Sequence, residues 1–220
     1  MKVCTDACAF GAWVNVCIKD FPVRYALDVG SGTGLLSLML AQENSFNIHA
    51  VEKDHNAFKQ SVENFVNSAW ENRLSAHHTD VLNWTPSYPF QFIICNPPFF
   101  KNDLPSKDIM KRNALHEDGL TLNKLFSLSG KWLDKTGFIA LLMPFHRIAE
   151  AIAAANENEF FLLRSAILKR NSRDEGFRGM MIFGRQQNPQ VAQEQLVIRN
   201  NDNEYAEPFI DLLKPYYLNL

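Results

Sequence analysis

The sequence lacks long apolar stretches and paired cysteines. No apolar run reaches the about 18 residues that a membrane-spanning helix requires, and none follows the opening residues Met1 to Asp6, so neither a membrane span nor a secretory signal is expected. The four cysteines, Cys4, Cys8, Cys17 and Cys95, form no Cys-x-x-Cys pair and no standard zinc spacing. We therefore expect a cytoplasmic protein with free thiols and no bound metal.

The chain also has little net charge. Its 22 basic and 24 acidic side chains give a formal charge of -2, so the whole molecule exerts no strong attraction on a phosphate backbone. One segment, Arg164 to Arg185, differs, because it holds six basic and two acidic residues, a local charge of +4. A solvated basic face and a local contact with nucleic acid both explain this segment, and the sequence leaves both open.

The order of apolar segments predicts an α/β protein. The chain of 220 residues, 46% of them hydrophobic, has the size of one large domain. Short apolar runs alternate with amphipathic segments, which is typical of a mostly parallel sheet with helices on both faces. We expect a Rossmann-like fold with seven strands, at residues 25–29, 48–51, 74–78, 92–95, 138–143, 161–168 and 180–183. Residues 195–199 are a candidate for one more strand, and helices are predicted from residues 35 and 56 and over 120–133 and 148–156.

A glycine-rich turn follows the first predicted strand. The residues are Asp28, Val29, Gly30, Ser31, Gly32, Thr33 and Gly34. Glycine lets the backbone turn sharply and approach a ligand closely. A dinucleotide fingerprint would need its third glycine at Leu35 or Ser37, so that interpretation fails. The remaining pattern, Asp-x-Gly-x-Gly-x-Gly, resembles the first motif of the S-adenosylmethionine-dependent methyltransferases.

Acidic residues end the next two predicted strands. Glu52 has the placement and chemistry to accept hydrogen bonds from both ribose hydroxyls of the cofactor, and Asp80 could accept one from the adenine amino group. Open α/β sheets bind ligands at the carboxyl ends of their strands, where Asp28 also lies. We expect Lys53 and Val81, which follow these acids, to belong to the same cofactor site.

The fourth predicted strand runs into Asn96, Pro97, Pro98 and Phe99. Successive prolines fix the backbone and lack N–H donors, so the Asn96 side chain and the Pro97 carbonyl can be held as two acceptors facing one pocket. Such a pair suits a planar NH₂ group, and Phe99 could stack on the flat face of a base. The four residues predict a catalytic site for N-methylation, with Asn96 also beside the cofactor. The long segment Lys101 to Gly119 behind them is predicted to be a lid or binding element.

Three blocks resemble the bacterial tRNA1(Val) (adenine(37)-N6)-methyltransferases along nearly the whole chain. They are Met1 to Asp6 with Gly11 to Trp13, Asn96 to Phe100 with Lys111 to His116, and Tyr205 to Phe209 with Tyr216 to Leu218. The resemblance implies transfer of a methyl group from S-adenosylmethionine to N6 of adenine 37 in the anticodon loop of a valine tRNA, by a monomer. It also implies RNA contacts from Arg112, His116, Lys169, Arg170, Arg173 and Arg178.

The sequence has no internal repeat, no low-complexity segment and no linker composition, so we expect a single domain over residues 1–220, and the resemblance implies how it is divided. Residues 1–24 would cover the cofactor, with Thr5 in contact with it, residues 25–190 would form the Rossmann-like core, and residues 191–220 would be a C-terminal extension. Other acceptors remain open, namely a glutamine amide in a protein release factor and an exocyclic base amine in another RNA. A catalytically silent RNA-binding protein would be expected to lack the cofactor acids or Asn96, and this chain has them.

Overall fold

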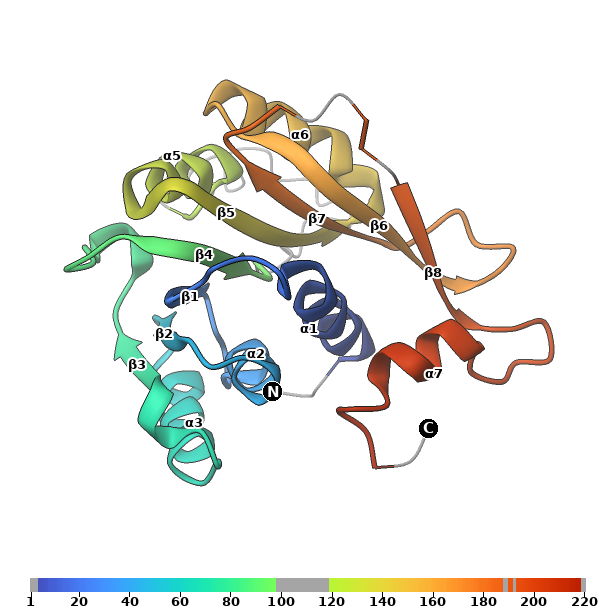
Figure 1. Cartoon of the computed structure of the whole chain (residues 1–220), viewed down its shortest axis with the longest axis horizontal. Helices are drawn as coiled ribbons and strands as arrows, with labels where there is room; N and C mark the ends of the chain where they lie inside the picture. Colours follow the sequence, from blue (N-terminus) through green and yellow to red (C-terminus); the bar gives the residue numbers. More distant parts are fainter. Residues whose placement is uncertain (1–3, 98–118, 188–189, 192, 219–220) are drawn as a thin grey trace, which may run out of the picture.

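The computed structural model describes residues 4–97, 119–187, 190–191 and 193–218. One sheet crosses this part of the chain in the order β3-β2-β1-β4-β5-β7-β6-β8 (Figure 1). β7 runs antiparallel to both of its neighbours, and the other pairings are parallel. The strands are β1 Tyr25–Val29, β2 Asn47–Glu52, β3 Leu74–His78, β4 Phe90–Cys95, β5 Leu133–Pro144, β6 Phe161–Asn171, β7 Arg178–Gly184 and β8 Gln193–Arg199.

The described sheet has eight strands, where seven were expected. The additional strand is β8, which covers the candidate at residues 195–199 and pairs in parallel with β6. The expected C-terminal extension therefore begins inside the sheet. Its helix α7, Glu207–Leu213, packs on β8 and on α1, Thr5–Ile18.

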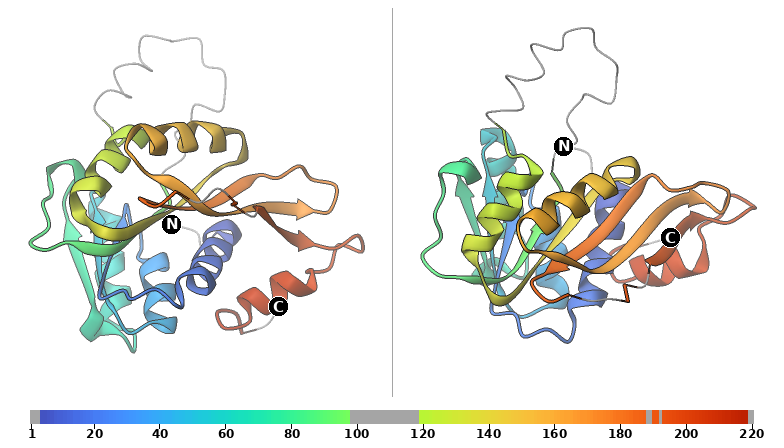
Figure 2. Two further views of the ribbon diagram at one scale, coloured as in Figure 1. Left: turned by 45° about the horizontal axis from the view of Figure 1, so that its top comes forward. Right: turned by 90° about the horizontal axis from the view of Figure 1, so that it is seen from above.

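Helices cover both faces, as predicted. One apolar core lies under α1, α7 and α2, Leu35–Glu43, and the other lies under α5, Leu122–Trp132, and α6, Ile148–Glu157. Figure 1 and the left view of Figure 2 show these two groups on opposite sides of the sheet. The fifth long helix, α3 His55–Val66, packs against β3 and β2. Side chains alternate between the faces, so Ile48 of β2 faces the first core and Val51 the second.

Helix α1 and the segment after α7 meet in a polar contact around Asn15. Asn15 of α1 donates from Nδ2 to the main-chain carbonyl of Met39 at 3.0 Å and to the hydroxyl of Tyr216 at 2.7 Å. Asn44 donates to Asn15 Oδ1 at 2.7 Å. The hydrogen bonds join α1, α2 and the C-terminal segment, and they satisfy a polar side chain that is 7% exposed.

The strand register gathers the sequence motifs at one edge of the sheet. Val29 pairs with both Val51 and Cys95, so Gly30, Glu52 and Asn96 are the next residues on three adjacent strands. Glu52 pairs in turn with His78, two residues before Asp80. No helix in the described part of the chain is long and apolar enough to cross a membrane.

Candidate methyltransferase site

The glycine turn is anchored to β2 and open on its outer side. The backbone N–H groups of Gly30 and Ser31 donate to the carbonyl of Val51 at 2.9 and 3.2 Å. Gly30 has a φ of +68°, a conformation that favours glycine, and a Cβ placed on it would meet nothing within 4 Å. A ligand can therefore approach the backbone at Gly30 without displacing protein atoms.

Gly34 closes the turn against α3. Its φ is +83°, and a Cβ there would lie 2.4 Å from Cε1 of Phe65. Both backbone strain and steric overlap oppose a side chain, so we expect Gly34→Ala to lower the free energy of unfolding by about 1–3 kcal/mol, measured by urea denaturation. Adding Phe65→Leu should recover only the steric part. Equal stability of Gly34→Ala and the wild type would contradict the geometry of this turn.

Asp28 lies beneath the turn and is 1% exposed. Its Oδ2 accepts hydrogen bonds from the hydroxyl of Ser37 at 2.7 Å and from the Ser37 N–H at 3.2 Å, while Oδ1 is buried with no partner. Burial raises the pKa of Asp28 to about 7, despite the Ser37 hydrogen bonds, which lower it. Asp28 therefore orients the start of α2 from inside the protein, and its Oδ1 can still accept a hydrogen bond.

The raised pKa of Asp28 gives stability a pH dependence. The unfolded chain loses this proton near pH 4 and the folded protein near pH 7, so the folded state binds more protons between these values and its stability falls as pH rises. We expect Asp28→Asn to remove this decline. The free energy of unfolding of the variant, relative to that of the wild type, should therefore be higher at pH 7.5 than at pH 5. Urea denaturation at both pH values measures this difference, and an unchanged pH slope would contradict it.

Glu52 holds the turn in place from the end of β2. One oxygen accepts from the N–H of Gly32 at 2.8 Å and the other from the N–H of Asp54 at 2.7 Å. A carboxylate oxygen has two lone pairs, so both oxygens retain acceptor capacity for ribose hydroxyls. Lys53, the next residue, is exposed.

Asp80 lies after β3 and begins the short helix η2, Val81–Asn83. Its Oδ1 accepts from the N–H of Leu82 at 3.0 Å, and Val81 is buried. Asp80 thus has a local structural role as a helix cap, and its other carboxylate oxygen remains available as an acceptor.

Asn96 follows β4 at the centre of the edge. Its Oδ1 is buried and has no hydrogen-bond partner in the protein. An unsatisfied buried oxygen is costly, which favours a bound donor at this position. Pro97 is half-buried. Pro98 and Phe99, the other two predicted catalytic residues, lie outside the described residues.

The predicted RNA contacts lie around the hairpin that joins β6 and β7. Arg170 is largely exposed and pairs with Asp174, Lys169 contacts Gln195 at 3.3 Å, and Arg173 is exposed. Arg178 instead pairs with Asp6 of α1, next to Thr5, which is the exposed first residue of that helix. Arg112 and His116 lie outside the described residues, as does most of the predicted lid.

Two residues that the sequence analysis did not single out support the site. Ser37 supplies both hydrogen bonds to Asp28, and Asn64 of α3 donates to the carbonyl of Thr33 at 2.9 Å. Ser37 lies on the expected helix, where it occupies a position at which a dinucleotide fingerprint would have its third glycine. Its contact with Asp28 was not predicted. Nothing near Asn64 in the sequence indicates that it reaches the turn 31 residues earlier.

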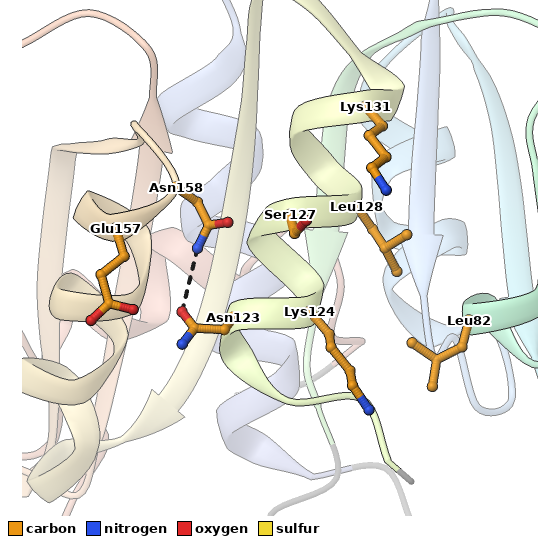
Figure 3. Close-up of a pocket in the computed structure, with 8 residues that line it drawn as sticks. All are labelled: Leu82, Asn123, Lys124, Ser127, Leu128, Lys131, Glu157 and Asn158. Atoms are coloured by element: carbon orange, nitrogen blue, oxygen red, sulfur yellow. Dashed lines mark hydrogen bonds between the residues drawn. The ribbon is translucent and has the colours of Figure 1, made fainter. Parts of the chain in front are cut away.

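A pocket of about 530 Å³ lies along α5 and reaches Leu82, two residues after Asp80 (Figure 3). Gly30, Glu52 and Asn96 do not line it. Its walls are Leu82, Asn123, Lys124, Ser127, Leu128, Lys131, Glu157 and Asn158. The candidate methyltransferase site is instead defined by the strand register, which brings Gly30, Glu52 and Asn96 together, and by the buried polar atoms there that have no partner.

The edge fits S-adenosylmethionine. Open backbone at Gly30, two buried oxygens without partners on Ser31 and Asn96, and the Glu52 carboxylate offer a close approach and hydrogen-bond acceptors. Among the described residues, no group of three or more His, Cys, Asp or Glu side chains could hold a metal ion. The fold and the site define a class I S-adenosylmethionine-dependent methyltransferase.

Comparisons with known proteins agree with this class. The family model described as methyltransferase small domain matches residues 14–137. The structure is similar to that of a predicted O-methyltransferase from Agrobacterium tumefaciens, with a TM-score of 0.72, 16% identity and coverage of 95% of both chains. It is also similar to magnesium protoporphyrin IX methyltransferase from Synechocystis, with a TM-score of 0.60, 15% identity and coverage of 83% of this chain and 79% of that one.

Curated relatives give the family. The chain is 32% identical to the tRNA1(Val) (adenine(37)-N6)-methyltransferase of Cytophaga hutchinsonii, over 100% of this chain and 92% of the relative. It is 33% identical to that of Pseudoalteromonas translucida, over 100% of this chain and 93% of the relative. The chain belongs to the tRNA1(Val) (adenine(37)-N6)-methyltransferase family.

Proposed function

We propose that this protein methylates N6 of adenine 37 in the anticodon loop of tRNA1(Val), working as a cytoplasmic monomer. The observation that carries the proposal is the unpaired, buried Oδ1 of Asn96, beside the glycine turn. An acceptor in this position suits a donor such as an exocyclic amine. The names of the relatives supply the particular tRNA and adenine.

The site residues would divide into cofactor and acceptor groups. Glu52 would hold the ribose and Asp80 the adenine amino group, and the glycine turn from Gly30 to Gly34, whose backbone is open at Gly30, would border the amino-acid end. Thr5, Lys53 and Val81 would complete the cofactor site. When bound, S-adenosylmethionine supplies a methyl group carried on a positively charged sulfur. Asn96 and the Pro97 carbonyl would hold the two hydrogens of the target amine.

Holding both hydrogens addresses the main chemical difficulty. The nitrogen of an adenine amine is a weak nucleophile because its lone pair is delocalised into the ring. Two acceptors favour a pyramidal nitrogen, which frees the lone pair, and a fixed orientation further lowers the barrier. Phe99 would stack on the extruded base, with Pro98 fixing the backbone before it.

Basic side chains on the β6–β7 hairpin would hold the anticodon arm. β6 is parallel to β5, which is parallel to β4, so the hairpin lies at the same edge of the sheet as Asn96. Arg170 and Arg173 are exposed there and could contact phosphates, together with Lys169. Arg112 and His116 would add contacts from the segment behind the catalytic motif.

The test is incubation of the protein with labelled S-adenosylmethionine and tRNA from cells that lack this modification. Mass spectrometry of the digested nucleosides should show N6-methyladenosine, and mapping of the purified valine tRNA should place it at position 37. A protein release factor is added to the same assay as the alternative acceptor. Transfer of the label to a glutamine of the release factor, with none to the tRNA, would contradict the proposal.

A further inference from the structure

Arg178, the first residue of β7, is held by protein groups on more than one side. Its Nε donates to Oδ2 of Asp6 at 2.8 Å, and its Nη1 donates to the carbonyl of Phe177 at 3.1 Å. The two side chains of the ion pair are only 24% and 14% exposed. The guanidinium of Arg178 is also 5.4 Å from the ring centroid of Phe177, close enough for a cation–π contact.

Arg178 differs from the basic residues near it in the burial of its own side chain, since Arg170 also has a carboxylate partner and a cation–π contact with Phe177. The side chain of Arg170 is 64% exposed in its ion pair with Asp174, and Arg173 is exposed in the turn. A phosphate contact would have to compete with Asp6 for Arg178, and breaking a largely buried ion pair leaves a carboxylate without its partner. Arg173 forms no ion pair with another described residue, and Arg170 is itself 64% exposed although its partner Asp174 is 18% exposed, so both can reach a phosphate with less loss of buried contact than Arg178.

The ion pair fixes the first turn of α1 to the edge of the sheet that carries the motifs. Arg178 pairs in register with Pro144, the last residue of β5, beyond the level at which Leu141 pairs with Cys95 of β4. Asp6 follows Thr5 directly, and its Oδ1 accepts from the N–H of Ala7 at 3.0 Å. The carboxylate thus joins the start of α1 to β7.

Close packing transmits this position to the glycine turn. A Cβ on Gly11 of α1 would lie 2.8 Å from Sδ of Met39, so α1 and α2 already touch at this point. α2 begins immediately after Gly34. A shift of the first turn of α1 would therefore change both the position of Thr5 and the support of the turn beside Gly30.

We infer that Arg178 is a positioning residue for cofactor binding and not a phosphate ligand. Through Asp6 it holds the start of α1 against the cofactor edge. The inference rests on the proposed function for the location of the cofactor within that edge, and it predicts that breaking the ion pair weakens cofactor binding while the RNA contacts persist.

The test measures binding of S-adenosylhomocysteine, without RNA, by titration calorimetry. Arg178→Gln and Asp6→Asn should each raise Kd about fivefold, and the double variant should bind no more weakly than either single variant, because the pair acts as a unit. Reversing the pair with Asp6→Arg and Arg178→Asp should recover part of the affinity. Lys135→Gln, an exposed lysine at the opposite edge of the sheet, is the control and should leave Kd unchanged.

RNA binding separates the two roles of a basic residue. Arg173→Gln should reduce the salt dependence of tRNA affinity by about one unit of slope and leave S-adenosylhomocysteine binding unchanged. Arg178→Gln should weaken S-adenosylhomocysteine binding and leave the salt slope of tRNA affinity unchanged. Hydrogen exchange should also be faster at the amides of Ala7 to Phe10 in Arg178→Gln.

Two results would overturn the inference. One is an unchanged Kd for S-adenosylhomocysteine in both Asp6→Asn and Arg178→Gln, even with a lowered melting temperature, since that indicates a purely structural ion pair. The other is a reduced salt slope in Arg178→Gln, which would make Arg178 a phosphate ligand. The proposed tRNA substrate is tested independently of this inference. It is contradicted if the wild-type protein binds S-adenosylhomocysteine but does not methylate tRNA.

Discussion

Replacing Asn96 with alanine is expected to lower kcat for tRNA methylation by about 10²–10³-fold, the effect of removing one oriented polar group from a reaction centre. Its buried Oδ1 has no partner in the protein, so the interaction that the substitution removes is the hydrogen bond proposed for the target amine. Single-turnover methylation of unmodified tRNA measures the loss directly.

The Asn96→Ala result needs a fold control and a residue control. Asn156→Ala changes an exposed asparagine at the end of α6 and should leave kcat unchanged. The urea midpoint should confirm that Asn96→Ala is folded. Retention of methyl transfer within a few-fold of the wild type, in a folded variant that binds the cofactor, would disprove the role given to this side chain.

Replacing Glu52 with alanine is expected to weaken S-adenosylmethionine binding by about 1–3 kcal/mol, or about 5- to 150-fold in Kd. The substitution removes the acceptors proposed for the ribose hydroxyls and the hydrogen bonds that Glu52 receives from the N–H groups of Gly32 and Asp54. Titration calorimetry with S-adenosylmethionine measures the change.

A second variant distinguishes ligand contact from support of the turn. Glu52→Gln keeps one carbonyl oxygen, but replaces the other with a donor that cannot accept from a backbone N–H. We expect it to bind the cofactor with intermediate affinity. Glu63→Ala, an exposed glutamate on α3, is the matched control, and equal Kd values for all three variants would remove Glu52 from the cofactor site.

The sequence predicted the elements whose signals are local. The apolar runs located β1 and β3 to the residue, and α6 differs by one residue at its end. The glycine spacing separated a methyltransferase turn from a dinucleotide turn, and the strand ends placed Glu52 and Asn96 at one edge. The register confirms this placement, since Val29 pairs with Val51 and Cys95.

Features that depend on distant contacts were not predicted. α1 is buried along most of its length, because helices and strands from both halves of the chain surround it, so its sequence has little amphipathic pattern to detect. The contact of Asn64 with Thr33 and the pairing of Asp6 with Arg178 likewise join segments that no periodicity relates. The roles of the site residues remain predictions.

The contact between Asn15 and Tyr216 has a consequence for biosynthesis. The two residues are 201 positions apart, so Asn15 is synthesised long before its partner. Contacts of such long range form late, because the chain between them must first be ordered or closed into a loop. During translation the first helix has no Tyr216 to bind, and the native packing around Asn15 is completed only after Tyr216 has left the ribosome.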